Sequence, residues 1–405
     1  MTPIMGKSNS QKRTSKRKRG SNPYGATEGT VPQAEAKPGG LLADLCSVEE
    51  SRRLEGCKML IGLFESGSAP LEALAADKIL NAMAQRLADS SGAVRLEAAG
   101  AVHNIAAALN PTICERMVSS GIFSTALGFI REYCEKGDGA LGVSAEVAAR
   151  IISQLLSCLA GIVAAHEVSS PESDLLDSAV HGYVLRLAVE ASTYPVRKSA
   201  VDLLAVLTDD TKLSCEYLVS LDGVNILRAQ LNADSTTLSM TTTKASLMQL
   251  GFMTTILNIF SNIPAAQAQS QIVPILNAAF SKIMLSGDIV NSIKQRSEEE
   301  HVDEALEVVK GVGEFIANAA SNLSTDGDGE NGSDGMDVES KRVLTAEETQ
   351  ALQSLQKDEI ISALFESVGL HYGILMDLIT QQKPINFHCV SLLDVLDRIM
   401  SAIAN

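Results

Sequence analysis

Residues 87–105 contain the sequence feature that most limits the possible folds. They read Leu-Ala-Asp-Ser-Ser-Gly-Ala-Val-Arg-Leu-Glu-Ala-Ala-Gly-Ala-Val-His-Asn-Ile, which is a helix end, a turn and a new helix. In the new helix, Ala98 and Ala101 allow a neighbouring helix to approach closely, and Val94 and Ile105 fill the seam between the two. A helix with such a face needs a tightly packed partner helix.

Weaker copies of this unit recur along the chain. From residue 41 onward, nearly all of the sequence shows the period of amphipathic helices broken by Gly, Ser, Asp or Pro, and no strand pattern is found. The pattern resembles an armadillo or HEAT repeat. It predicts an all-α superhelical solenoid of roughly six or seven irregular units, each packed only on its neighbours. The copies are anchored at Val94, Ala148, Val196, Met248 and Val308, and segments 117–122 and 218–224 both resemble the short turn that opens an armadillo repeat.

Composition divides the chain into four parts. Residues 1–40 are predicted to be a disordered basic tail, 41–323 armadillo-like helical repeats, 324–342 a disordered acidic loop and 343–405 C-terminal HEAT-like repeats. The acidic loop nearly matches a calcium-binding loop, but Asn331 stands where glycine is required, so a docking or solubilising loop is favoured over a calcium site. Its acidic residues are Asp326, Asp328, Glu330, Asp334, Asp337 and Glu339.

Charge is distributed unevenly between the tail and the rest of the chain. Residues 1–40 carry eight Lys/Arg and two Asp/Glu, whereas residues 41–405 carry twenty-five and forty-seven, a net charge of −22. A strongly negative body disfavours direct binding of nucleic acid and favours basic protein ligands. The seven cysteines form no C-x-x-C motif, and no apolar stretch is typical of a secretory signal or a spanning helix. We therefore expect a monomeric protein of the cytosol or nucleus, without membrane binding.

No catalytic or cofactor-binding pattern stands out, so we expect neither an enzyme nor a cofactor. The segment Gly137–Gly142 matches G-x-G-x-x-G, but it follows a helical pattern and is interpreted as an inter-helix loop rather than a nucleotide site. The six histidines are scattered without metal-ligand spacing, which favours surface or core histidines over a metal site.

Three asparagines, Asn104, Asn258 and Asn318, occupy a similar register in three copies of the repeat. In armadillo proteins, an asparagine of the inner helix often binds the backbone of an extended peptide in the concave groove, since an amide offers both donor and acceptor. The resemblance thus implies cargo binding by these residues. A chance alignment of helix-face asparagines is the alternative.

The tail carries a candidate recognition motif. Lys16, Arg17, Lys18 and Arg19 form a basic run that is followed, after three residues, by Pro23 and Tyr24. Arg19-x-x-x-Pro23-Tyr24 resembles the proline-tyrosine nuclear localisation signal that transportin-type importins bind. A nonspecific basic arm or a signal for importin-α are the alternatives.

Several of these features together are similar to the symportin family, including the HEAT repeat-containing protein 3 type. The features are Met5-Gly-Lys-Ser, the Lys-Arg-Lys-Arg run, Asn22-Pro-Tyr24 and Leu87-Ala-Asp-Ser-Ser with Val94-Arg95. The resemblance implies a shuttling adaptor that imports large-subunit ribosomal proteins five and eleven, which accompany 5S rRNA. This chain is shorter than the usual members of that family. The alternatives are an armadillo-type peptide-binding scaffold, a heat-shock co-chaperone and a nuclear enzyme regulator.

Overall fold

The computed structural model describes residues 38–165, 178–209, 212–238 and 244–263, together with residues 308 and 311. Within these ranges the chain is built from helices, and no strand occurs in them. The helices are α1 (Pro38–Leu45), α2 (Glu50–Ser66), α3 (Leu71–Leu74), α4 (Asp77–Leu87), α5 (Gly92–Ala106), α6 (Pro111–Ser119), α7 (Ile122–Lys136), the 3-10 helix η1 (Gly137–Gly142), α8 (Ala145–Ala165), α9 (Ser178–Glu190), α10 (Tyr194–Asp209), α11 (Lys212–Ser220), α12 (Gly223–Thr237) and α13 (Lys244–Ser261).

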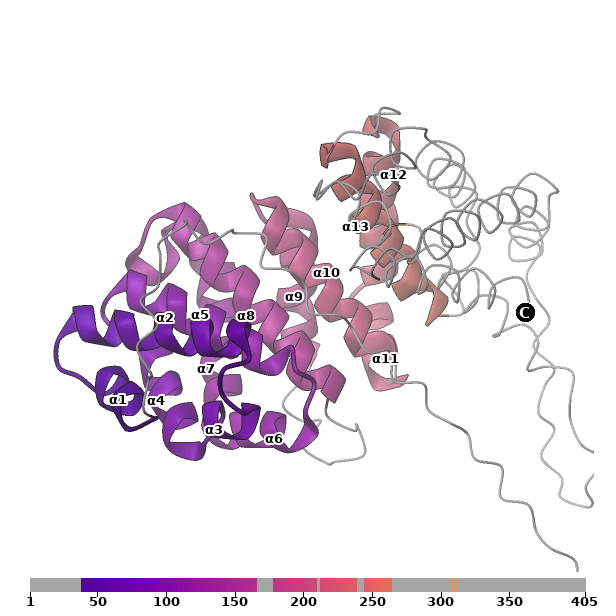
Figure 1. Cartoon of the computed structure of the whole chain (residues 1–405). Helices are drawn as coiled ribbons and strands as arrows, with labels where there is room; N and C mark the ends of the chain where they lie inside the picture. The colour runs from indigo at the N-terminus through magenta and orange to yellow at the C-terminus, as the bar shows by residue number, and fades with distance from the viewer. Residues whose placement is uncertain are drawn as a thin grey trace, which may run out of the picture.

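The helices stack in two parallel rows (Figure 1). In row A, α2, α5, α8, α10 and α13 each pack on the next, and in row B the same holds for α1, α4, α7, α9 and α12. The short helices α3, α6 and α11 precede the row B helix of their repeat. Repeat 1 is therefore α1–α2, repeat 2 is α3–α5, repeat 3 is α6–α8, repeat 4 is α9–α10 and repeat 5 is α11–α13. One short helix followed by two long ones is the armadillo arrangement, so the fold is all-helical and armadillo-like.

Local sequence signals explain where several helices begin and end. The hydroxyl of Ser91 caps α5 by accepting from the backbone N–H of Val94, and the side chain of Asn110 caps α6 by accepting from Ile113. Gly121 takes up the left-handed backbone that turns α6 into α7, with φ at 83°. These caps satisfy backbone groups that the helix ends leave free.

Helix α8 forms the centre of the core, packed between α5 and α10 and beneath α7. Its Gly161 allows α8 to approach α5 closely, because a Cβ there would lie 2.9 Å from backbone atoms of Ala106 in α5. Among the described helices, α8 has the length and apolar composition of a membrane-crossing helix. However, 72% of its apolar window is buried inside the fold, which is the situation of a core helix.

The predicted repeat anchors Val94, Ala148, Val196 and Met248 lie in the row A helices α5, α8, α10 and α13, which confirms the helical periodicity. The two similar turns join α6 to α7 and α11 to α12. The G-x-G-x-x-G segment is η1, the connection between α7 and α8, as an inter-helix interpretation requires. Helix α1 begins at Pro38, within the segment assigned to the tail, and proline is well tolerated in a first helical turn.

The burial of most described cysteines predicts strongly unequal thiol reactivity. Burial raises the pKa of Cys57 and of Cys114 to about 12, whereas Cys46 is exposed. Because the thiolate is the reactive form, we expect both buried thiols to be alkylated at pH 8 on the order of a thousandfold more slowly than Cys46. Mass-spectrometric mapping of labelled cysteines over time measures this ratio. Labelling in denaturant should equalise the rates, and equal rates in the native protein would contradict the burial.

Candidate functional site

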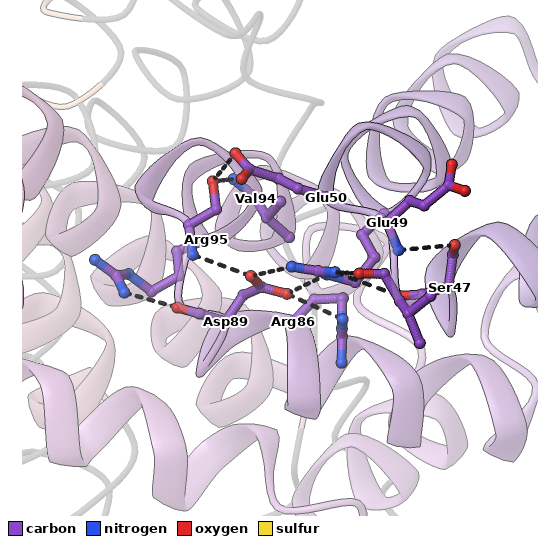
Figure 2. Close-up of polar contacts among 10 residues, drawn as sticks. Ser47, Glu49, Glu50, Arg86, Asp89, Val94 and Arg95 are labelled. Carbon is purple, nitrogen blue, oxygen red and sulfur yellow. Dashed lines mark hydrogen bonds and ion pairs between the residues drawn. The ribbon is translucent and has the colours of Figure 1, made fainter.

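A buried carboxylate, Asp89, lies at the corner between α4 and α5 and connects two repeats (Figure 2). Arg53 of α2 donates to it through Nε at 2.7 Å and through Nη2 at 2.9 Å. Arg86 donates from Nη1 at 2.9 Å, and the backbone N–H of Ser91 donates at 3.0 Å. Only 3% of the Asp89 side chain is exposed, so these donors replace its water.

The charge of Asp89 is favoured by this arrangement. Burial by itself would raise the pKa of Asp89, but the hydrogen bonds from Arg53 and from the Ser91 amide and the charge of Arg86 lower it below its usual range. The carboxylate is therefore ionised at neutral pH, and it holds the start of α5 against α2.

Arginines at the starts of row A helices contact the following repeat. Arg53 in repeat 1 binds the side chain of Asp89 in repeat 2. Arg95 in repeat 2 donates Nη2 to the backbone oxygen of Leu141 in repeat 3, and Nη1 to the backbone oxygen of Asp89 in its own repeat. Leu141 has a left-handed backbone, with φ at 63°. These contacts link the beginnings of neighbouring row A helices.

The same pattern returns at the end of the described array. Arg197 in repeat 4 reaches Asp234 of repeat 5, with Nη2 and Oδ2 3.6 Å apart. Its guanidinium group also lies over the ring of Phe252, 4.8 Å from the ring centroid. Gln249 donates to the backbone oxygen of Asp234, as Arg95 does to that of Asp89. The corner contacts thus help to position α5 against α2, α8 against α5 and α13 against α10.

On α5, Gly100 lies at the centre of the exposed face of row A. Gly100 is buried although it lies in the middle of that face, because Ile61 of α2 and Gln154 of α8 extend over it from both sides. A Cβ at this position would lie 3.5 Å from Cδ1 of Ile61 and 3.3 Å from Nε2 of Gln154. The half-exposed and exposed positions that surround Gly100 at helical spacing are Ala93, Leu96, Glu97, His103, Asn104 and Ala107.

Three polar side chains around Gly100 have unused hydrogen-bonding capacity. Gln154 is only 9% exposed, and its buried Oε1 has no hydrogen-bond partner in the described structure. Asn104 and Glu97 are half-buried, and neither makes a hydrogen bond or ion pair with the described residues. Burial lowers the pKa of the neighbouring His103, so its imidazole is neutral at pH 7. This part of row A therefore offers donors and acceptors that the fold does not consume.

Farther along row A, the polar groups bind one another. Between α8 and α10, the hydroxyl groups of Ser153 and Ser199 lie 2.9 Å apart, and Ser157 donates to Ser199 at 3.2 Å. Lys198 pairs with Asp202 within α10. Unlike the polar side chains around Gly100, these residues thus use their hydrogen-bonding groups on one another.

On α13 the corresponding positions are covered by the chain itself. Gly251, Thr254 and Asn258 match Glu97, Gly100 and Asn104 in register, as 154 residues separate the members of each pair. A Cβ on Gly311 would lie 3.3 Å from Oγ1 of Thr254 and 4.0 Å from Nδ2 of Asn258, and a Cβ on Gly251 would lie 3.6 Å from Val308. Residues 308 and 311 therefore lie over this face of α13.

The structure therefore places the predicted site residues in different surroundings. Asn104 lies on the exposed face of α5, as a groove residue should, whereas Asn258 lies against Gly311. Outside the described residues fall Asn318, the importin-binding residues Lys16, Arg17, Lys18, Arg19, Pro23 and Tyr24, and the acidic-loop residues Asp326, Asp328, Glu330, Asp334, Asp337 and Glu339. The contribution of all these residues to binding stays a prediction.

Sequence reasoning missed Gln154, Glu97 and the role of Asp89. The arginine in the Val94-Arg95 and Val196-Arg197 pairs was a usable signal for the corner contacts, because a charged residue beside a core residue in two copies needs a partner. Gln154 gave a weaker signal, a single amide within the apolar sequence of α8.

Comparisons with known proteins add distant structural similarity. No family model matches the chain, and a search of the curated proteins finds no match. Among solved structures, a designed armadillo repeat protein overlaps at 16% identity over 68% of this chain and 99% of its own, with a TM-score of 0.43. A structure titled for the interaction between cadherin and beta-catenin overlaps at 14% identity over 91% of this chain and 80% of its own, with a TM-score of 0.40. At such distances the fold assignment depends on the helix order of the chain itself.

Proposed function

We propose that this chain is a protein-binding scaffold that holds a basic polypeptide on row A and joins it to a transportin-type importin through its N-terminal segment. The observation that carries the scaffold function is the group of unpaired polar side chains around Gly100. Folded proteins rarely leave a buried amide without a partner unless a ligand or water completes its hydrogen bonds. The corner contacts of Arg53 and Arg95 fix the helices that present this group.

The proposed cargo is drawn from the sequence resemblance to the symportin family. It consists of the basic large-subunit ribosomal proteins associated with 5S rRNA, numbers five and eleven, which the scaffold would accompany from cytoplasm to nucleus. The sequence support lies in the tail motif at residues 16–24 and in the repeat unit at residues 87–105. Basic cargo of this kind needs a partner that screens its charge before it binds RNA.

The location of the acidic charge refines this proposal. The helical ranges 38–165, 178–209, 212–238 and 244–263 contain twenty Asp/Glu and sixteen Lys/Arg, which is nearly balanced. The rest of residues 41–405 contains twenty-seven Asp/Glu and nine Lys/Arg. Most of the net charge of −22 thus belongs to other segments, including the acidic stretch at 324–342. In this proposal those segments supply long-range attraction to basic cargo, and row A supplies short-range contacts.

Affinity purification of the tagged full chain followed by mass spectrometry tests the cargo. We expect a transportin-type importin to be enriched together with large-subunit ribosomal proteins five and eleven. Enrichment of heat-shock chaperones without those ribosomal proteins would instead refute the adaptor function.

The tail assignment predicts a separate loss of importin binding. With Pro23→Ala and Tyr24→Ala combined, we expect affinity for transportin to fall by at least about thirtyfold, because small sets of anchoring side chains dominate such interfaces. Nuclear accumulation should fall with it. Binding assays with purified transportin and imaging of the tagged chain measure both effects. Pro32→Ala in the same tail is the control, and an unchanged affinity of the double variant would refute the motif.

A further inference from the structure

We propose that Gln154 binds the main chain of an extended basic segment that crosses row A at α5 and α8. The inference rests on the proposed scaffold function and deepens it by naming the binding residue and the form of the ligand. It assigns the central contact to Gln154 of α8, a position that differs in register from the asparagines suggested by the repeat pattern.

The hydrogen-bonding state of Gln154 is the first argument. A primary amide offers two donors and an acceptor, and Gln154 is 9% exposed with a buried, unpartnered Oε1. Removing such a group from water without replacing its hydrogen bonds disfavours the folded state. Gln154 therefore destabilises the free protein, and a ligand that hydrogen-bonds to its amide would offset that destabilisation.

The absence of a side chain at Gly100 is the second argument. Gly100 lies beside Nε2 of Gln154 in the centre of the exposed face of α5. Glycine at this position leaves room for the end of the Gln154 side chain to lie over α5, on the face that a segment crossing row A would contact. A larger residue would push the end of the Gln154 side chain aside, because even a methyl group would lie 3.3 Å from it.

The surrounding groups favour an extended and basic occupant. An extended segment presents free backbone N–H and C=O groups that match both functions of an amide, whereas a helix has already paired them internally. The equivalent face of α13 is covered by Val308 and Gly311 of the chain itself. There the hydroxyl of Thr254, which matches Gly100 in register, already donates a hydrogen bond to the backbone oxygen of Gly251. At α5, by contrast, the unpaired Glu97 carboxylate would attract a lysine or arginine of the segment.

The test uses the full chain with an octapeptide of alternating lysine and arginine as the probe. We expect Gln154→Met to weaken peptide binding by about 5- to 15-fold in fluorescence anisotropy, the effect of losing one or two hydrogen bonds. The same substitution should raise Tm by about 2–4 °C, because it removes an unsatisfied amide while conserving side-chain volume. A residue that merely supports the fold would lower Tm instead, which would overturn the proposal.

A peptide with N-methyl groups on alternate residues tests the main-chain contact directly. It should bind the wild-type chain more weakly than the unmodified peptide by a similar factor, and Gln154→Met should add little further loss. Full additivity of the two losses would overturn the proposal, because it would mean that Gln154 and the backbone N–H groups act independently.

Asn232→Leu provides the control, because Asn232, like Gln154, has an amide oxygen without a partner in the described structure, but it is half-buried and lies on α12 in row B. Its affinity for the peptide should equal that of the wild type. An equal loss in Asn232→Leu and Gln154→Met, or no binding of the probe to the wild type, would overturn the inference. Unchanged capture of ribosomal cargo by Gln154→Met would overturn it while leaving the scaffold function intact.

Discussion

Asp89→Ala is expected to lower the free energy of unfolding by about 3 kcal/mol, the lower end of the range for a broken buried ion pair. The loss arises because Arg53 and Arg86 would keep their charges in a site where only 12% and 15% of their side chains are exposed. The backbone N–H of Ser91 would lose its acceptor as well. Urea denaturation followed by circular dichroism measures the change.

A surface carboxylate supplies the control for this substitution. Asp77 pairs with Arg116 at 2.6 Å, but 75% of its side chain is exposed. Asp77→Ala should therefore cost less than about 1 kcal/mol. If the two substitutions destabilised the protein equally, the corner at Asp89 would not be the buried junction described above.

Acid sensitivity should follow from the same site. Because the folded-state pKa of Asp89 is lowered, its contribution to stability is fully present above the unfolded-state pKa of about 4 and is lost as pH falls through the folded pKa. Asp89→Asn should show a smaller loss of stability on acidification than the wild type. Urea midpoints recorded between about pH 6 and pH 3 compare the two, and parallel curves would contradict the lowered pKa.

Gly161→Ala is expected to destabilise the protein by about 1–3 kcal/mol. The added methyl group would lie 2.9 Å from the backbone carbon and oxygen of Ala106, which cannot rotate away as a side chain could. The higher helix propensity of alanine, about 0.5–1 kcal/mol, opposes this effect without cancelling it. The result should be a separation of α5 from α8, measurable as a lower Tm.

Gly128→Ala is the matched control, because Gly128 lies inside α7 and a Cβ there meets nothing within 4 Å. There the gain in helix propensity acts alone, so Tm should rise slightly. Opposite signs for the two glycine substitutions would support the close approach of α5 and α8. A rise in Tm for both would mean that the two helices are not held so tightly.

The fold was predictable because its signals are local. The small and apolar residues of α5 recur within one or two helical turns, so Val94 and Ala98 mark a packed helix without any knowledge of its partner. The corner at Ser91 is equally local, since a capping serine acts within three residues. Stacking then follows, because amphipathic helices of this kind must bury their faces against one another.

The candidate site was only partly predictable, because exposure depends on distant residues. Asn104 and Asn258 share a register, and the sequence cannot distinguish them. The structure does, because Gly311, fifty-three residues beyond Asn258, lies against it. Gln154 likewise becomes a candidate binding residue only because it lies beside Gly100, a residue of another repeat. The sum of charges over residues 41–405 also did not show that most of the negative charge lies outside the described helical ranges.

The corner arginines have a consequence for engineering. Arg53, Arg95 and Arg197 all contact acceptors in the following repeat, and repeat 2 carries both the acceptor for repeat 1, Asp89, and a donor to repeat 3, Arg95. A graft that exchanges the whole of repeat 2 would break one such contact at each of its two boundaries. The backbone acceptor at Leu141 would accept an arginine from any donor repeat, whereas Asp89 demands a matching one. The unit that can be exchanged is thus the junction between two repeats, an arginine together with its acceptor in the next repeat. A design that lengthens this array should keep each such pair together.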